Sequence, residues 1–324
     1  MTTPRTPTFS IIIEWENARF AELDRTRKML RALRAQLIEL DPPSSPPEVL
    51  FLYTRENISG DMVQSVVAEE FRPAGVPAAT RIIATDGLRY YEQKNFGARQ
   101  CGGEIKVLLD CDVVPEPGWL KAILGSFANP DVHVAAGQTY IEHDSLYSRA
   151  VALYWFCPLR DPRSGLVPTD VFHANNVAFR AEVFDAYPFP DLPSNRDQCL
   201  QLARRLTAAG IGLYTQREAR AGHPVPLGVW YFIRKAINDG RDQAVMRDAV
   251  ERSNLPPFRH VWWNWRKGVA KNFGRFRTQY RDVGLGPLGA AGGFAIAVLW
   301  CSLMTVGEIL HLLRPSLVPK LFPV

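Results

Sequence analysis

The sequence is poor in cysteine, and its cysteines lack the spacing of a metal or redox motif. The five are Cys101, Cys111, Cys157, Cys199 and Cys301, and no two of them are three residues apart. Without a CxxC pair, the chain has no sequence signature of a zinc site. The odd count and the irregular spacing predict reduced thiols in a cytosolic compartment and not a disulfide framework.

The chain also lacks a large excess of charge of either sign. It has 38 Lys and Arg residues against 33 Asp and Glu residues, which gives a net charge of +5. Residues 259–282 alone contain seven basic residues and one acidic residue, so the other 300 residues sum to −1. We therefore expect no nucleic-acid-binding body, but one local basic patch.

The overall composition excludes several classes of chain. With 47% hydrophobic and 22% charged residues among 324, the protein is neither disordered nor collagen-like nor a small disulfide scaffold. An apolar run at 9–13 is too short for a signal peptide. Residues 283–307, in contrast, carry no charge over 25 positions, which exceeds the roughly 20 residues that a helix needs to span a bilayer.

Apolar runs and amphipathic segments alternate through the first 136 residues. Strands are predicted at 9–13, 49–53, 81–84, 105–109 and 132–136. The helices predicted between them are 17–40 with Asn17 as its cap, 61–71, 91–101, and 117–127 with Pro117 as its first residue, and a proline-rich loop is expected at 41–48. In the first helix the leucines share one face, while Arg25 and the other basic residues lie largely elsewhere. This alternation predicts an α/β fold with a mostly parallel sheet and helices on both of its faces.

The pattern becomes irregular after residue 150. A loop is expected at 161–170, a helix at 198–209 that ends at Gly210, a short strand at 211–214 and a mostly helical segment at 227–250. Sheets of this class bind ligands beyond the carboxyl ends of their strands, so a site is expected there.

Two carboxylates stand at the end of the predicted strand 105–109. Asp110 and Asp112 flank Cys111, and Pro115 and Pro117 then direct the chain out of the sheet. Residues at i and i+2 of a strand face the same side, so the two carboxylates repel each other unless a cation lies between them. Oxygen ligands of this kind suit Mg²⁺ or Mn²⁺, and Mg²⁺ leaves coordination positions for phosphates. The alternative is an acidic turn that caps the next helix.

This segment resembles the metal-binding DxD region of glycosyltransferase family 2. The matching residues are Gly103, Glu104, Ile105, Leu108, Leu109, Asp110, Asp112, Pro115, Pro117, Gly118, Trp119 and Leu120. Further blocks occur in the order of that family. Two precede the DxD segment, at 10–17 and 94–98, and two come after it, at 175–180 and 196–206, with His223 last. The resemblance covers about residues 9–240. It implies a GT-A (Rossmann-like) fold, a nucleoside-diphosphate-sugar donor, a divalent ion and inversion at the anomeric carbon.

The resemblance also implies roles for individual residues. Asp112 would ligate Mn²⁺ or Mg²⁺, Asp110 would bind the metal indirectly or hold the ribose, and His223 would be a further metal ligand. Lys94, Glu14 and Glu16 would contact the donor, while Asn175 and Asn176 would bind hydroxyls on the acceptor side. The alternatives are a turn histidine for His223, an exposed helix lysine for Lys94, loop acids for Glu14 and Glu16, and a satisfied turn for the two asparagines.

Asp197 is the candidate catalytic residue. An inverting transfer needs a carboxylate that removes the proton of the acceptor hydroxyl, and the resemblance places this base at Asp197. The alternative is that Asp197 caps the helix that begins at Gln198, for which aspartate is a favoured residue type.

The sequence departs from the family pattern at several positions. Glu14-Trp15-Glu16 replaces Pro-Thr-Tyr, Tyr53-Thr54 replaces an Asp pair that contacts the nucleobase, and Arg196 replaces a glutamate. The lack of a QxxRW motif disfavours a processive synthase. A non-catalytic nucleotide-sugar-binding module with a degenerate site is the alternative function. A sugar nucleotidyltransferase is disfavoured, because residues 14–19 contain no glycine.

The basic segment 259–282 also contains aromatic residues, among them Trp262, Trp263 and Trp265. Nucleic acid or an anionic membrane surface suits such a composition, and the uncharged stretch that follows favours the membrane. A spanning helix, a re-entrant hairpin and a monotopic anchor are all compatible with this stretch, as is a buried helix or a homodimer interface.

We therefore expect a GT-A domain over residues 1–250, a basic aromatic juxtamembrane segment over 251–282 and a hydrophobic helical tail over 283–324. The predicted function is that of an inverting hexosyltransferase at the cytoplasmic face of the cell membrane. It would transfer a sugar to a lipid-linked or surface-glycan acceptor.

Overall fold

The structure is a computed structural model. It describes residues 8–16, 23–40, 46–72, 75–194, 196–225, 227–247 and 256–322. Asn17, expected as a helix cap, and residues 41–45 of the expected proline-rich loop lie outside the described residues.

The chain forms two compact units. The sheet unit consists of Met1–Tyr140, Arg160–Asp191 and Gln198–Pro224, and the helical unit consists of Ile141–Leu159, Leu192–Asp197 and Val225–Val324. These units do not follow the composition-based boundaries at 250 and 282, which remain predictions about function.

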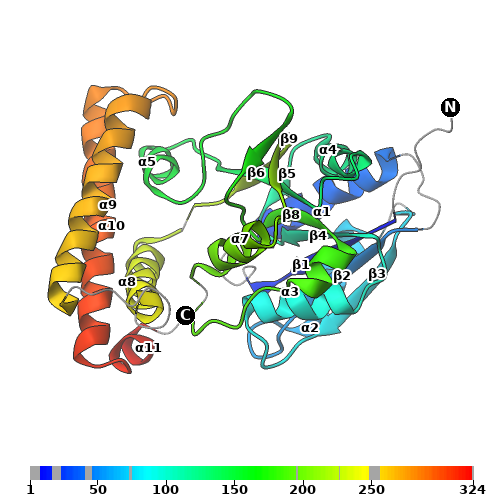
Figure 1. Cartoon of the computed structure of the whole chain (residues 1–324), viewed down its shortest axis with the longest axis horizontal. Coiled ribbons are helices and arrows are strands. Elements are labelled where there is room, and N and C mark those ends of the chain that lie inside the picture. Colours follow the sequence, from blue (N-terminus) through cyan, green and yellow to red (C-terminus); the bar gives the residue numbers. More distant parts are fainter. Residues whose placement is uncertain are drawn as a thin grey trace. The chain divides into compact units, whose positions relative to one another are not determined.

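The sheet unit contains four parallel strands that the sequence pattern predicted. They are β1 (Phe9–Glu14), β2 (Glu48–Tyr53), β3 (Ala79–Ala84) and β4 (Ile105–Asp110). Five further strands continue the sheet, namely β5 (Val114–Pro115), β6 (Val134–Ile141), β7 (Leu166–Thr169), β8 (Asn176–Arg180) and β9 (Leu213–His223). The strand order is β3-β2-β1-β4-β8-β6-β9-β5, with β7 also paired to β9 (Figure 1). The β4–β8, β6–β8, β5–β9 and β7–β9 pairs are antiparallel.

Alternate residues of the parallel strands form two apolar cores. Ile11 and Ile13 of β1 lie in the core that includes α1 (Leu23–Glu39), α2 (Gly60–Glu70) and α4 (Trp119–Gly125). Ile12 lies in the other core, with α3 (Tyr90–Arg99), α6 (Ala181–Ala186) and α7 (Gln198–Ala208). Because successive side chains of a strand point to opposite faces, helices cover both faces of the sheet. This confirms the predicted α/β architecture.

Three local predictions were wrong. The segment 161–170 is not all loop, because Leu166–Thr169 pairs with β9 as β7. The strand expected at 211–214 is β9, which runs on to His223. Pro117 does not begin a helix: Gly118 follows it with φ +84°, a conformation that glycine adopts without strain, and α4 begins only at Trp119.

The helical unit is built around one long helix. It contains α5 (Leu146–Tyr154), α8 (Val229–Met246), α9 (Pro257–Gln279), α10 (Pro287–Leu313) and α11 (Leu317–Leu321), and α10 packs against all four of the others. A Cβ on Gly240 of α8 would lie 1.9 Å from the carbonyl oxygen of Met304, and one on Gly307 of α10 would lie 2.0 Å from that of Ile237. The backbones of α8 and α10 are therefore in direct contact.

Candidate functional site

The carboxyl ends of the parallel strands bring four acidic residues to one edge of the sheet. Glu14 is the last residue of β1 and pairs in register with Asp110, the last residue of β4. Glu16 and Asp112 follow these strands two residues later. The structure therefore brings Glu14, Glu16, Asp110 and Asp112 to the same edge, and their roles in one site remain a prediction.

Asp110 is held by two side chains of α3. The Nζ of Lys94 lies 2.7 Å from Asp110 Oδ1, and the hydroxyl of Tyr90 lies 2.9 Å from each carboxylate oxygen. Lys94 has no exposed surface and Asp110 is 3% exposed. Tyr90 and Lys94 are four residues apart, so they share one face of the helix. Burial, with the nearby Asp110 charge, raises the pKa of Tyr90 well above its usual value, so its hydroxyl stays a donor.

Two features place α3 close to the sheet. The side chain of Glu92 accepts a hydrogen bond from the backbone N–H of Arg89 (2.7 Å), as in a capping box, and this fixes the start of the helix. A Cβ on Gly97 would lie 2.7 Å from side-chain atoms of Ile12 and of Leu52, so a larger residue there would require these buried side chains to shift.

Glu14 is a buried acid that shapes the loop after β1. It has no exposed surface, and its Oε2 accepts a hydrogen bond from the backbone N–H of Glu16 at 2.8 Å. Burial and the neighbouring Asp110 carboxylate raise the pKa of Glu14 well above its usual range. These contacts give Glu14 a supporting position below the surface, and the donor contact expected for it stays a prediction.

Glu16 joins the ends of β1 and β2 to α3. Its carboxylate accepts hydrogen bonds from Thr54 (2.7 Å), Asn57 (2.5 Å) and Gln93 (3.1 Å). Thr54 stands where the family pattern has an aspartate, so its hydroxyl now serves Glu16. Glu16 is half-buried, and its carboxylate lies beside the end of β2.

Asp112 differs from the other acids because one of its oxygens has no partner among the described residues. Asp112 is 6% exposed, and its Oδ1 is buried without a hydrogen-bond donor in the described part of the chain. Burial raises the pKa of Asp112, while His223 opposes that shift and Asp110 adds to it. A buried carboxylate oxygen without a donor costs free energy unless something pairs with it.

His223 lies next to Asp112 through strand pairing. Val114 pairs with Gly222 and Pro115 with Ala221, so the segment after Asp112 runs beside the end of β9. The Nδ1 of His223 lies 2.6 Å from the carbonyl oxygen of Pro224. A carbonyl only accepts, so Nδ1 carries the proton and Nε2 has the lone pair in the neutral ring.

Two nearby residues were missed by the sequence analysis. Arg25 of α1 donates from Nε to the carbonyl oxygen of Asp112 (2.8 Å) and from Nη2 to that of Gly222 (2.6 Å). Burial and the charge of His223 lower the pKa of His173 to about 4, so His173 is neutral near pH 7. Arg25 looked like one more basic residue on the polar side of a helix, and His173 had no motif around it.

Asn175 and Asn176 make contacts within the sheet. Asn176 accepts a hydrogen bond from Trp119 Nε1 (2.8 Å) and donates to the carbonyl oxygen of Ala219 (3.2 Å), while Thr139 donates to Asn175 Oδ1 (3.1 Å). Both asparagines are buried. These bonds tie β8 to β6, α4 and β9, and the acceptor-side role expected for the pair remains a prediction.

Asp197 belongs to the helical unit and directly precedes α7. Its φ of 61° lies in the left-handed region, and it is the one such non-glycine residue in the described part of the chain. A helix N-cap has an extended backbone instead, so this geometry argues against a simple capping role. Arg196 Nε lies 3.8 Å from Asp197 Oδ2.

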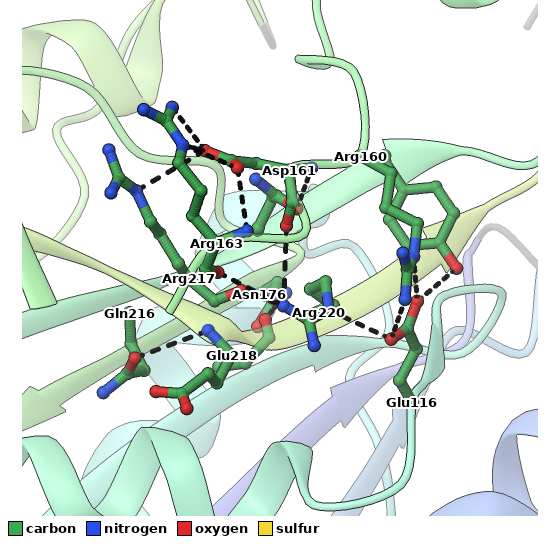
Figure 2. A network of polar contacts seen from close by, with 12 residues as sticks. Glu116, Arg160, Asp161, Arg163, Asn176, Gln216, Arg217, Glu218 and Arg220 are labelled. Carbon is green, nitrogen blue, oxygen red and sulfur yellow. Dashed lines mark hydrogen bonds and ion pairs between the residues drawn. The ribbon is translucent and has the colours of Figure 1, made fainter. Parts of the chain in front are cut away.

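A polar network fixes the segment that follows Asp112 (Figure 2). Glu116 accepts hydrogen bonds from Tyr140 (2.7 Å), from Arg160 (2.7 and 2.9 Å) and from Arg220 of β9 (3.1 Å). Above all the Arg160 bonds lower the pKa of Glu116 to about 2. Asp161 extends the network to Arg163 and Arg217. The network therefore holds β5 and β9 together just beyond Asp112 and His223.

No group of three or more His, Cys, Asp or Glu side chains in the described part of the chain is arranged to hold a metal ion. Asp110 is engaged by Lys94 and Tyr90. Asp112 and His223 carry the carboxylate and imidazole groups that Mn²⁺ accepts as ligands. Mg²⁺ is commonly held by one or two carboxylates, with waters and substrate phosphates completing its shell. A site with this few protein ligands fits that pattern.

One protein-family model matches part of the sequence. Residues 66–187, which include α3, β4 and the DxD segment, match the model of glycosyl transferase family 2. The match covers less than half of the chain, and this part of the sequence is similar to glycosyltransferase family 2. No curated protein matches the sequence.

Two solved structures are similar in fold to this chain. One is the mannosyltransferase PcManGT from Pyrobaculum calidifontis in complex with GDP-Man and Mn²⁺ (TM-score 0.57, 16% identity, 97% of this chain and 89% of that chain). The other is GalNAc-T7 with UDP, GalNAc and Mn²⁺ (TM-score 0.50, 10% identity, 78% of this chain and 52% of that chain). At these identities the likeness concerns the fold alone, and it confirms the GT-A fold expected from the sequence.

We predict that the buried Lys94–Asp110 ion pair contributes to the stability of the fold. Lys94→Met leaves the Asp110 carboxylate buried without its cation, so we expect a loss of about 3–5 kcal/mol in the free energy of unfolding. The double variant Lys94→Met/Asp110→Asn removes both charges and should recover part of that loss. Urea denaturation measures the free energy of unfolding of both variants.

Arg27→Met is the matched control. Arg27 forms its ion pairs with Glu69 and Glu70 outside the site, where all three side chains are partly exposed, so about 1 kcal/mol or less is expected. An unfolding free energy of Lys94→Met equal to that of the unsubstituted protein would contradict the buried ion pair.

Proposed function

We propose that this protein is a metal-dependent, inverting glycosyltransferase of the hexosyltransferase type. It moves a sugar from a nucleoside diphosphate sugar to a hydroxyl of a lipid-linked or surface-glycan acceptor. The observation that supports this best is the buried Asp112 oxygen without a donor, beside a histidine whose Nδ1 proton is fixed by a carbonyl.

Asp112 and His223 are the residues that would hold Mn²⁺ or Mg²⁺. The carboxylate oxygen of Asp112 suits either ion, and the Nε2 of His223 suits Mn²⁺ better than Mg²⁺. Mn²⁺ is the ion in both similar structures. With a divalent ion held by Asp112 and His223, the site would neutralise the charge of a departing diphosphate.

The remaining acids have supporting tasks in this proposal. Asp110, fixed by Lys94 and Tyr90, presents a rigid carboxylate that would hold the ribose or bind the metal indirectly. Glu16 faces the donor beside β2. Lys94 acts through Asp110, because its Nζ is fully buried against that carboxylate and the side chain has no exposed surface.

Asp197 is proposed as the general base. As the acceptor hydroxyl attacks the anomeric carbon, the carboxylate takes its proton, and the diphosphate leaves from the opposite face of the sugar. Backbone strain at a non-glycine residue is found preferentially at functional sites, and the left-handed φ of Asp197 fits that tendency.

Membrane association is the second part of the proposal. Within the described residues, α10 is the one helix long and apolar enough to cross a bilayer. The basic helix α9 precedes it and exposes Trp262 and Trp263. Both features suit attachment to the cytoplasmic face of a membrane, where a lipid-linked acceptor would lie.

The proposal is tested by donor turnover in the variant Asp112→Asn. UDP-, GDP- and dTDP-sugars are first screened for thermal stabilisation with and without Mn²⁺, and hydrolysis or transfer of the donor that binds is then measured. The ion stabilises the leaving group by several kcal/mol, so we expect the rate to fall at least about 100-fold.

Asp131→Asn, which changes an exposed acid in the sheet unit, is the control and should keep the full rate. Unchanged turnover in Asp112→Asn would reject the metal role. Metal-dependent nucleotide binding without any turnover in the unsubstituted protein would favour the non-catalytic binding module instead.

A further inference from the structure

The exposed side of α9 combines aromatic and basic residues. Phe258, Trp262, Trp263 and Phe273 are all about half exposed, which is unusual for side chains of this size. The basic residues Arg259, Arg266, Lys267, Lys271 and Arg277 are exposed as well. The helix contains no acidic residue. Its exposed side is therefore suited to an anionic surface with an apolar layer beneath it.

The exposed side of α10 is apolar from one end to the other. Leu288, Leu299, Val306 and Leu313 are exposed, Leu288 almost completely (91%). The spacing of seven residues from Leu299 to Val306 and to Leu313 places these three side chains along one line of the helix. The opposite side of α10 is buried through residues such as Ala297 and Trp300 in the core of the helical unit.

The neighbours of α10 carry charges along their length. At its contact with α10, Gly240 of α8 stands between Asp239 and Arg241, which form ion pairs with Lys235 and Asp242 respectively. On α9, which packs beside α10, five exposed basic residues lie between Arg259 and Arg277 inclusive. If α10 crossed a bilayer in this packing, these charges would enter the hydrocarbon layer.

Such charges are unfavourable at the centre of a bilayer and favourable at an anionic surface. We therefore infer that the helical unit lies in the plane of an anionic membrane, with the exposed side of α9 among the lipid headgroups, and that α10 does not span. This inference rests on the membrane association proposed above and selects one of the geometries that the sequence left open.

Vesicle flotation of the full chain tests whether the helical unit lies in the plane of an anionic membrane. The protein should float with vesicles that contain phosphatidylglycerol, float weakly with phosphatidylcholine alone, and leave the vesicles in high salt without detergent. The variant Arg266→Gln/Lys267→Gln/Lys271→Gln should bind the anionic vesicles at least about tenfold more weakly.

The matched control is Lys28→Gln/Lys121→Gln/Arg204→Gln. It removes the same number of exposed basic charges from the sheet unit and should float like the unsubstituted protein. Donor hydrolysis without vesicles checks that both triple variants are folded.

The other outcomes separate the two claims. Protein that only detergent extracts, from neutral vesicles as well, would overturn the in-plane geometry and leave membrane association intact. Absence from both kinds of vesicle would overturn both. A triple α9 variant that dissolves a homodimer while vesicle binding is unchanged would assign this surface to a second copy of the chain.

A separate observation concerns Arg25. Its guanidinium bonds to the carbonyl oxygens of Asp112 and Gly222, the residue before His223, at 2.8 and 2.6 Å. These two carbonyls belong to segments that are far apart in the sequence and meet at β5 and β9. The geometry points to Arg25 as a positioning residue that sets the distance between Asp112 and His223 and so the affinity for the divalent ion.

Mn²⁺ binding in the absence of turnover tests this role. Electron paramagnetic resonance follows the free Mn²⁺ signal as the ion is titrated into the protein with a nucleoside diphosphate. We expect Arg25→Gln to weaken Mn²⁺ binding by about 10- to 100-fold, as is usual for residues that orient metal ligands. Arg27→Gln, on the same helix but paired with Glu69 and Glu70, should bind Mn²⁺ normally.

Arg25→Lys keeps the charge but cannot form both hydrogen bonds in the same geometry. This variant is used for the Mn²⁺ titration if Arg25→Gln does not fold. Its affinity should also fall. Normal Mn²⁺ affinity in a folded Arg25 variant would overturn the positioning role. Failure of the unsubstituted protein to bind Mn²⁺ would overturn the metal site itself, and this role with it.

Discussion

The site depends on how one buried lysine and a few hydrogen-bond donors accommodate four acids at one sheet edge. The Asp110 carboxylate is paired with Lys94 and Tyr90. Glu14 is deep in the sheet with a raised pKa, and Glu16 is held by Thr54, Asn57 and Gln93. Asp112 is the acid whose buried oxygen is left without a donor among the described residues. A bound cation would complete this arrangement, because uncompensated buried charge is costly.

The sequence predicted the parallel strands and the placement of the DxD segment because those signals are local. Ile11 to Ile13 form an apolar run, and Asp110 stands where such a run ends. The contacts that organise the site are not local. Lys94 reaches Asp110 only after α3 folds onto the sheet, and Arg25 joins two segments that are far apart in the chain. The strand β7 also depends on a distant partner, since Leu166–Thr169 becomes a strand by pairing with β9.

The location of the C-terminal segment also depends on contacts that the sequence does not reveal. From composition alone, residues 283–307 suit a spanning helix as well as a surface anchor. The choice depends on the neighbours of α10, which the sequence does not reveal. A basic side chain costs about 2.5–3.5 kcal/mol at the bilayer centre and gains about 1 kcal/mol near an anionic surface. With Arg266, Lys267 and Lys271 midway along α9, these magnitudes favour the surface.

The most direct measurement of the central claim is diffraction at the manganese absorption edge from crystals grown with Mn²⁺ and a nucleoside diphosphate. We predict an anomalous peak in contact with Asp112 Oδ1 and His223 Nε2 and with the diphosphate oxygens. Asp110 should still be bound to Lys94 in those crystals. A nucleotide bound at this edge without a metal beside Asp112 would contradict it.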